Sequence, residues 1–205
     1  HWAMAELGLR YETRAIGPRT GETKTQEYTR LNPRQKVPML QDGDFSIGES
    51  AAIVAYLART YGTPDRSLIP EDKQAYAKWL EWCFFIVTEL DSTSLYVMRR
   101  HSASALGHIY GVAPDVTAKA GEYFREQLRH VEVALDDGRT FLMGDQFTSA
   151  DILLTTCLEW AIAYEVGICD IAKPYLARIQ QRPGYQRGKA ANVPPAAGEP
   201  VIRPA

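Results

Sequence analysis

The chain has few cysteines and no long apolar run, and these shortages exclude several classes of protein. Its 205 residues include only Cys83, Cys157 and Cys169, which form neither a Cys-x-x-Cys pair nor a zinc-binding spacing. No apolar stretch reaches the ~18 residues that a membrane-spanning helix needs, and no charged-then-apolar leader opens the chain. We therefore expect no membrane partner and, because unpaired thiols suit a reducing compartment, a cytoplasmic location.

Excess charge of either sign is also lacking. Lys and Arg number 23 against 25 Asp and Glu, a formal net charge of −2, and no basic stripe is interleaved with aromatics. We expect no nucleic-acid partner. The segment 17–23 lacks the Gly-Lys-Ser/Thr of a phosphate loop, and no Gly-x-Ser-x-Gly elbow occurs. The histidines at 101, 108 and 130 lack metal-ligand spacing, so no metal site is expected.

What is present is an ordinary globular composition, 45% hydrophobic and 23% charged, in a chain long enough for one large or two small domains. Helix and strand signals alternate up to residue 62. The elements expected there are a helix closed by Gly8, a strand over 11–16, a helix over 24–31, strands over 38–40 and 45–47 joined by the Asp42-Gly43-Asp44 turn, and a helix over 49–61.

After a linker over 63–70, helical spacing prevails. Helices are expected from 76 to 90 with a core stripe that includes Tyr76 and Val87, over 116–135, over the strongly apolar 152–163 as a buried central helix, and over 174–181 up to Arg182-Pro183. The tail over 193–205 carries four of the twelve prolines, and we expect it to be irregular.

The most specific pattern lies between residues 32 and 53. Val37-Pro38 precedes the apolar pair Met39-Leu40, and Glu49-Ser50 opens the expected helix. An X-Pro bond can be cis at a cost of about 0.5–1 kcal/mol, and a cis bond would leave the Val37 amide and carbonyl unpaired and facing outward. Free N–H groups at a helix start hold a carboxylate well. The pattern fits a site for a small, extended, charged peptide, or alternatively a plain hairpin followed by an amphipathic helix.

This pattern resembles the glutathione site of the cytosolic glutathione transferase family. In that family the residue before a cis-Pro pairs its backbone with the cysteinyl part of glutathione, and a Glu/Ser-type pair at the third helix holds the γ-glutamyl end; Val37-Pro38 and Glu49-Ser50 match. The resemblance covers nearly the whole chain. It implies a thioredoxin-like α/β domain over 1–62 followed by an all-α domain over 71–192.

A second motif strengthens the resemblance. Thr148 and Asp151 have the spacing of a reciprocal helix cap, flanked by Phe147 and Ile152, which can pack as a hydrophobic staple. The family carries the same cap at the start of its buried core helix, after a Gly-Asp turn that Gly144-Asp145 supplies here. We expect Thr148 and Asp151 to be structural; the alternative for Asp151 is a general acid.

The resemblance implies binding roles for Glu49, Ser50 and Lys36. Glu49 would pair with the α-ammonium of the γ-glutamyl end, and Ser50 would bind its carboxylate. Lys36 would reach the glycyl carboxylate, unless it is a solvated loop lysine. The electrophile pocket is expected between the two halves, where Tyr96, Arg99 and Arg100 could face it; a dimer surface or plain solvent exposure is the alternative for these three.

The group that stabilises the glutathione thiolate is not assigned. In the family a Tyr, Ser or Cys does this at the end of the first strand or the start of the first helix, and that region would precede His1, where no initiating Met stands. We expect the first strand and roughly ten or more residues to precede His1. Without that strand, two others would lack neighbours.

The sequence therefore predicts a glutathione transferase that conjugates glutathione, its co-substrate, to small electrophiles in detoxification, as a homodimer and without a metal. Two alternatives stay open. One is a non-catalytic binding or regulatory protein on the same fold, and the other is a cysteine-type glutathione-dependent reductase or dehalogenase. The residue type in front of His1 would discriminate among the three.

Overall fold

The computed structural model describes residues 1–193 and 201–203 of the chain and divides into two compact units. The first unit joins His1–Leu68 with Pro183–Ala205, and the second is Ile69–Arg182. The first mixes helices with short strands and the second is helical, so the predicted fold class is confirmed. The predicted boundaries need a correction, because residues from Pro183 onward group with the first unit instead of the helical one.

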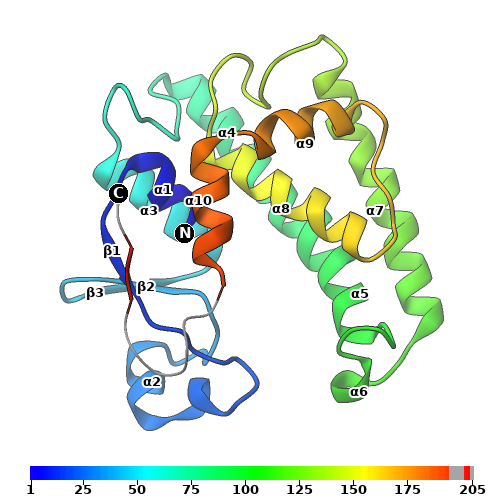
Figure 1. Ribbon diagram of the computed structural model, residues 1–205. Helices are drawn as coiled ribbons and strands as arrows, with labels where there is room; N and C mark the ends of the chain where they lie inside the picture. The colour runs from blue at the N-terminus through cyan, green and yellow to red at the C-terminus, as the bar shows by residue number, and fades with distance from the viewer. Residues whose placement is uncertain (194–200, 204–205) are drawn as a thin grey trace. The chain divides into compact units, whose positions relative to one another are not determined.

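The first unit is built from short elements (Figure 1). They are α1 (Trp2–Leu7), β1 (Tyr11–Thr13), the 3-10 turn η1 (Glu22–Lys24), α2 (Gln26–Leu31), β2 (Met39–Asp42), β3 (Phe45–Gly48), α3 (Ser50–Tyr61), α10 (Pro183–Ala191) and β4 (Val201–Arg203). Gly8 ends α1 in the left-handed conformation, at a φ of 67°, which glycine adopts without steric cost.

Two antiparallel pairs make up the strands among the described residues of this unit. Met39 pairs with Gly48 and Asp42 with Phe45 across the β2–β3 hairpin, whose turn places Gly43 at a φ of 59°. β1 pairs with β4, Tyr11 opposite Arg203. Each strand thus has a neighbour, and the irregular tail expected over 193–205 is wrong at Val201–Arg203. Residues 194–200 and 204–205 of that tail lie outside the described residues.

The helices at the two ends of the chain pack together, as Figure 1 shows for α1 and α10. The Trp2 and Tyr185 rings meet edge to face at 5.1 Å, and the Arg187 guanidinium donates to the Ala5 carbonyl at 2.8 Å. The approach is close enough that a Cβ added to Gly188 would lie 2.6 Å from Trp2 Cα. The sequence does not predict α10, because Pro183 follows a predicted helix as a stop signal, although proline also suits a first helical position.

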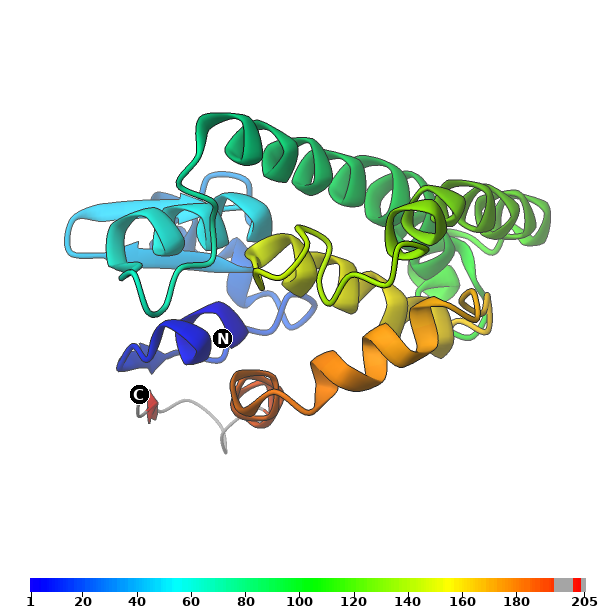
Figure 2. The ribbon, with the colours of Figure 1, turned by 90° about the horizontal axis from the view of Figure 1, so that it is seen from above.

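The second unit contains only helices among its described residues. They are α4 (Lys73–Phe85), the π-helix η2 (Ile86–Leu95), α5 (Tyr96–His101), α6 (Gly107–Tyr110), α7 (Pro114–Leu135), α8 (Ser149–Ala163) and α9 (Ala172–Gln180). Helix α8 lies between α9 and the continuous α4–η2 helix (Figure 2). Ala150, Leu154, Leu158 and Ala161 of α8 are 0% exposed, as expected for the central helix.

The π-helix changes which residues of the first long helix are buried. Its wider turns bring residues five apart into register, and Ser94 Oγ donates to the Glu89 carbonyl at 2.5 Å. The core stripe therefore continues through Ile86, Leu90 and Leu95. Tyr76, which the regular spacing placed on the stripe, is 37% exposed.

Candidate functional site

The loop between α2 and β2 is held in place by side chains of α2 and its C-terminal end. The Lys36 carbonyl accepts hydrogen bonds from Tyr28 Oη at 2.6 Å and Asn32 Nδ2 at 2.7 Å. Asn32 Oδ1 also accepts from the Arg34 N–H at 3.1 Å. Tyr28 is only 7% exposed, so its hydroxyl is a fixed anchor. These bonds set the position of the segment that leads into Val37.

Val37 has a backbone available to a ligand. The Val37–Pro38 peptide bond is cis. Val37 is 40% exposed, and no hydrogen bond to its backbone N–H or carbonyl is recorded from any residue the structure describes. Lys36, next to it, is exposed, and its ammonium has no recorded partner in the same part of the chain. The segment therefore offers one N–H, one carbonyl and one cation.

Glu49 occupies an unusual backbone conformation at the start of α3. Its φ is 67° and its ψ is 120°, a region that costs a non-glycine residue about 1–3 kcal/mol and that clusters at functional sites. Ile53 N–H donates to the Glu49 carbonyl at 2.9 Å, so the residue caps the helix through its backbone. The Glu49 carboxylate is exposed, and Ser50 begins the helix beside it.

Arg34 joins the two halves of this region. Its guanidinium forms an ion pair with Glu49 Oε1, and the two side chains are 69% and 60% exposed. The sequence pattern did not predict Arg34 as a site residue, because the contact links positions fifteen apart through the fold of the loop and hairpin. The predicted residues Lys36, Val37, Pro38, Glu49 and Ser50 all lie in the first unit, and Arg34 is added to their surroundings.

The predicted cap stands at the start of α8. Asp151 is 0% exposed and accepts from the Leu142 N–H at 2.8 Å, the Thr148 N–H at 2.8 Å and Tyr175 Oη at 2.7 Å. Thr148 and Asp151 form a capping box. Burial raises the pKa of the Asp151 carboxyl, and the hydrogen bonds from Leu142, Thr148 and Tyr175 oppose that rise. With these donors around it, Asp151 is closed off from any substrate.

Comparison with known proteins agrees with the family resemblance. Residues 1–59 match the profile of the glutathione S-transferase N-terminal domain, and residues 114–187 match that of its C-terminal domain. Glutathione S-transferase theta-1 of Bos taurus is 33% identical over 183 residues, which are 84% of this chain and 71% of that protein. This chain belongs to the glutathione S-transferase family.

Other family members resemble the chain to a similar degree. Glutathione S-transferase 1 of Schizosaccharomyces pombe is 32% identical over 73% of this chain, which spans 64% of that relative's length. The crystal structure of the theta class glutathione S-transferase of Xanthomonas axonopodis pv. citri, with glutathione bound, is 27% identical with a TM-score of 0.77. That alignment covers 91% of this chain and 88% of the crystallised one. The chain is therefore a member of a transferase family.

The three residues predicted to line an electrophile pocket lie on α5, but two of them turn to different neighbours. The Arg99 guanidinium carbon lies 5.0 Å from the centre of the Trp160 ring of α8. That of Arg100 lies 4.3 Å from the Tyr110 ring of α6. Tyr96 is 36% exposed. Asp91, one turn before, has a buried Oδ1 without a recorded partner, and burial raises its pKa.

None of the cysteines has the environment of a reactive thiolate. Burial raises the pKa of Cys83 to about 12 and that of Cys169 to about 11, and it raises the pKa of the deeply buried Cys157 well above its ordinary value. Reactive cysteines instead have lowered pKa values and partial exposure. Thiol exchange through these three residues is therefore disfavoured.

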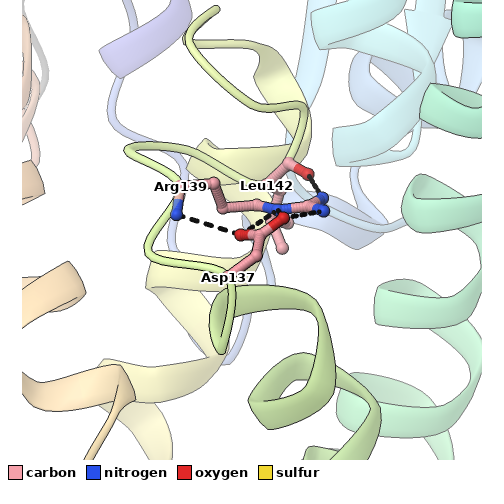
Figure 3. A network of polar contacts seen from close by, with 3 residues as sticks. All are labelled: Asp137, Arg139 and Leu142. Carbon is pink, nitrogen blue, oxygen red and sulfur yellow. Dashed lines mark hydrogen bonds and ion pairs between the residues drawn. The ribbon is translucent and has the colours of Figure 1, made fainter.

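The turn before the cap of this transferase is braced by a second carboxylate (Figure 3). Asp137 accepts from Arg139 Nε at 2.9 Å, Arg139 Nη2 at 2.7 Å and the Arg139 N–H at 3.0 Å. Arg139 Nη1 in turn donates to the Leu142 carbonyl at 3.0 Å. Leu142 thus connects the Asp137–Arg139 pair to Asp151, and both carboxylates have structural roles.

The described residues include neither a metal-binding cluster nor a helix that could span a membrane. Across residues 1–193 and 201–203, no group of three or more His, Cys, Asp or Glu side chains is arranged to hold a metal ion. Over the same residues, no helix has the length and apolar character needed to cross a membrane.

Proposed function

We propose that this transferase-family chain binds glutathione across residues 36–50 and takes part in conjugating its thiolate to small electrophiles. The observation that carries the proposal is the exposed Val37 backbone, free of recorded partners in the described residues, in the same unit as Glu49 and Ser50 at the start of α3. The glutathione bound to the related Xanthomonas protein supports the choice of ligand.

Each group of the site has a complementary part of glutathione. The Val37 N–H and carbonyl pair with the cysteinyl backbone as a short strand would. Glu49 takes the α-ammonium, and Ser50 takes the α-carboxylate through its hydroxyl and its N–H at the helix start. Lys36 takes the glycyl carboxylate. The ligand is then held at both ends and along its middle, which fixes the sulfur in one place.

The chemistry proposed is attack of the thiolate on an electrophilic carbon, with displacement or addition. A thiol with a pKa near 8.5 must be stabilised as its anion, which a hydroxyl donor does by hydrogen bonding. No residue of the chain is assigned this role. Tyr96, Arg99 and Arg100 are proposed for the electrophile. Binding without catalysis stays the second candidate, since the binding groups are assigned and the thiolate-stabilising group is not.

Titration calorimetry with glutathione tests the binding proposal. The unmodified chain should bind, and Glu49→Ala should weaken binding about tenfold, since a charge-assisted hydrogen bond is lost. Glu27→Ala, which removes an exposed glutamate of α2 in the same unit, is the matched control and should bind as the unmodified chain does. Equal affinity of the two variants would reject Glu49. Conjugation to an aryl halide, followed by absorbance, separates catalysis from binding alone.

A homodimer, a cytosolic location and a role in detoxification are further proposals that rest on the family resemblance. Light scattering after size-exclusion chromatography tests the first of them. A mass about twice the 23.0 kDa of the chain supports the dimer, and a mass equal to that of one chain rejects it.

A further inference from the structure

The inference concerns Arg34 and rests on the proposed function. We infer that Arg34 is a specificity residue of the glutathione site: it binds the α-carboxylate of the γ-glutamyl group while Glu49 binds the neighbouring α-ammonium. The exposed Arg34–Glu49 ion pair would then recognise an amino-acid zwitterion as one unit.

The Arg34–Glu49 ion pair leaves hydrogen-bonding positions free for the ligand. Arg34 contacts Oε1 of Glu49, and no contact of Oε2 is recorded within the described part of the chain. A guanidinium has five N–H donors, and the structure records a contact for one nitrogen, Nη1, among the described residues. Both partners therefore keep free positions on the same side-chain pair. An ammonium beside Oε2 and a carboxylate beside the remaining guanidinium donors would close a ring of four alternating charges.

The charge pattern of the surface agrees with that of glutathione. At neutral pH the peptide carries two carboxylates and one ammonium. The charged residues of the proposed site are two cations, Arg34 and Lys36, and one anion, Glu49. In the proposed function Lys36 takes the glycyl carboxylate, so the α-carboxylate would otherwise be held only by the uncharged Ser50. Arg34 supplies the second cation, and it does so next to the group that takes the ammonium.

The local backbone holds both members of the pair where a ligand can use them. The Arg34 N–H is bonded to Asn32 Oδ1 at 3.1 Å, and the Glu49 backbone is kept at a φ of 67°. Exposed ion pairs are weak, so little is lost when the ligand rearranges this one. A competing role, in which Arg34 blocks Glu49 until glutathione displaces it, predicts the opposite effect of removing the guanidinium.

Calorimetry with two ligands distinguishes these roles. The ligands are glutathione and 4-aminobutyryl-cysteinyl-glycine, which is glutathione without its α-carboxylate. Arg34→Gln should weaken glutathione binding about five- to tenfold and should leave binding of the decarboxylated peptide unchanged. The affinity of Arg34→Lys for glutathione should lie between those of the unmodified chain and Arg34→Gln, because lysine keeps the charge but loses the fork of donors. Arg30→Gln, an exposed arginine of α2, is the matched control.

Each other outcome overturns the inference. An unchanged or tighter affinity of Arg34→Gln for glutathione removes Arg34 from carboxylate recognition, and tighter binding identifies it as a competitor. Equal weakening for both peptides assigns it only to the orientation of Glu49. If the unmodified chain binds neither peptide, the proposed function fails together with the inference. Binding by the unmodified chain with no Arg34 effect rejects the inference alone.

Discussion

The exposed carboxylate of Asp137 stabilises the turn that follows α7. Hydrogen bonds from the Arg139 side chain and N–H lower the pKa of Asp137 from 3.8 to about 2. A carboxyl whose pKa falls on folding stabilises the protein fully above its unfolded pKa, and this contribution disappears as the pH drops through the folded pKa. The window for Asp137 therefore extends from about pH 4 down to about pH 2.

Asp137→Asn should lower the melting temperature at neutral pH, and the gap from the unmodified chain should close within that window. Asp136→Asn is the control. It changes the adjacent exposed aspartate, which has no recorded ion pair among the described residues. Melting followed by circular dichroism from pH 2 to pH 7 gives both curves. A gap that stays constant across the acid range would mean that the Asp137–Arg139 pair does not contribute to stability.

At the scale of elements, the contact of α1 with α10 depends on two glycines. A Cβ at Gly188 would meet Trp2 Cα at 2.6 Å and Trp2 N at 2.9 Å, which are backbone atoms that cannot turn away. The three atoms nearest to a Cβ at Gly184 all belong to the Glu6 side chain, with Cδ at 2.4 Å, and that side chain can rotate at the cost of its hydrogen bond from Trp2 Nε1. The two positions therefore differ in cost although both lie in one helix.

Gly188→Ala should lower the free energy of unfolding by about 1–3 kcal/mol, as overpacking does. Gly184→Ala is the matched comparison and should be near neutral, because the helix propensity of alanine offsets the movement of Glu6. Urea unfolding of both variants measures the difference. Equal stabilities would show that α10 can shift away from α1 without loss.

The elements also show what the sequence can and cannot predict. The β2–β3 hairpin carries the Asp-Gly-Asp turn as a local signal, and α8 carries the Thr148–Asp151 cap. Both elements occur where expected. The π-helix over 86–95 has no such signal, because a wide turn is favoured by packing against other helices and not by residue spacing. β4 was missed for a similar reason, since its pairing with β1 joins opposite ends of the chain.

The candidate site follows the same rule. Val37-Pro38 and Glu49-Ser50 are short motifs that can be read directly, whereas Arg34 becomes visible only when the folded loop brings it to Glu49. Exposure of a polar side chain is also set by tertiary contacts. Tyr56 and Tyr61 of α3 both donate from their hydroxyls to Asp42, whereas Val54 and Ala58 of the same helix are buried.

At the scale of the whole molecule, the groups proposed to bind glutathione and the buried Asp151 cap lie in different units. The proposed glutathione-binding groups belong to the first unit, and Asp151 with its buried donors belongs to the second. Removing the Asp151 carboxylate leaves the Leu142 N–H, the Thr148 N–H and the Tyr175 hydroxyl without an acceptor in a site that is 0% exposed. Each unsatisfied buried donor costs about 1–3 kcal/mol.

Asp151→Ala should therefore lower the free energy of unfolding by about 3–5 kcal/mol, yet the folded fraction should bind glutathione with unchanged affinity. Glu49→Ala should do the reverse, weakening binding while its melting temperature stays close to that of the unmodified chain. Asp145→Ala, an exposed aspartate of the same turn, should alter neither quantity. Asp151→Asn keeps the side-chain shape and serves if the alanine variant does not fold. Calorimetric titration at low temperature measures the affinity for glutathione, and thermal melting measures stability. An Asp151 variant with a normal melting temperature but lost glutathione affinity would show that this carboxylate acts in ligand binding and not in the stability of the fold.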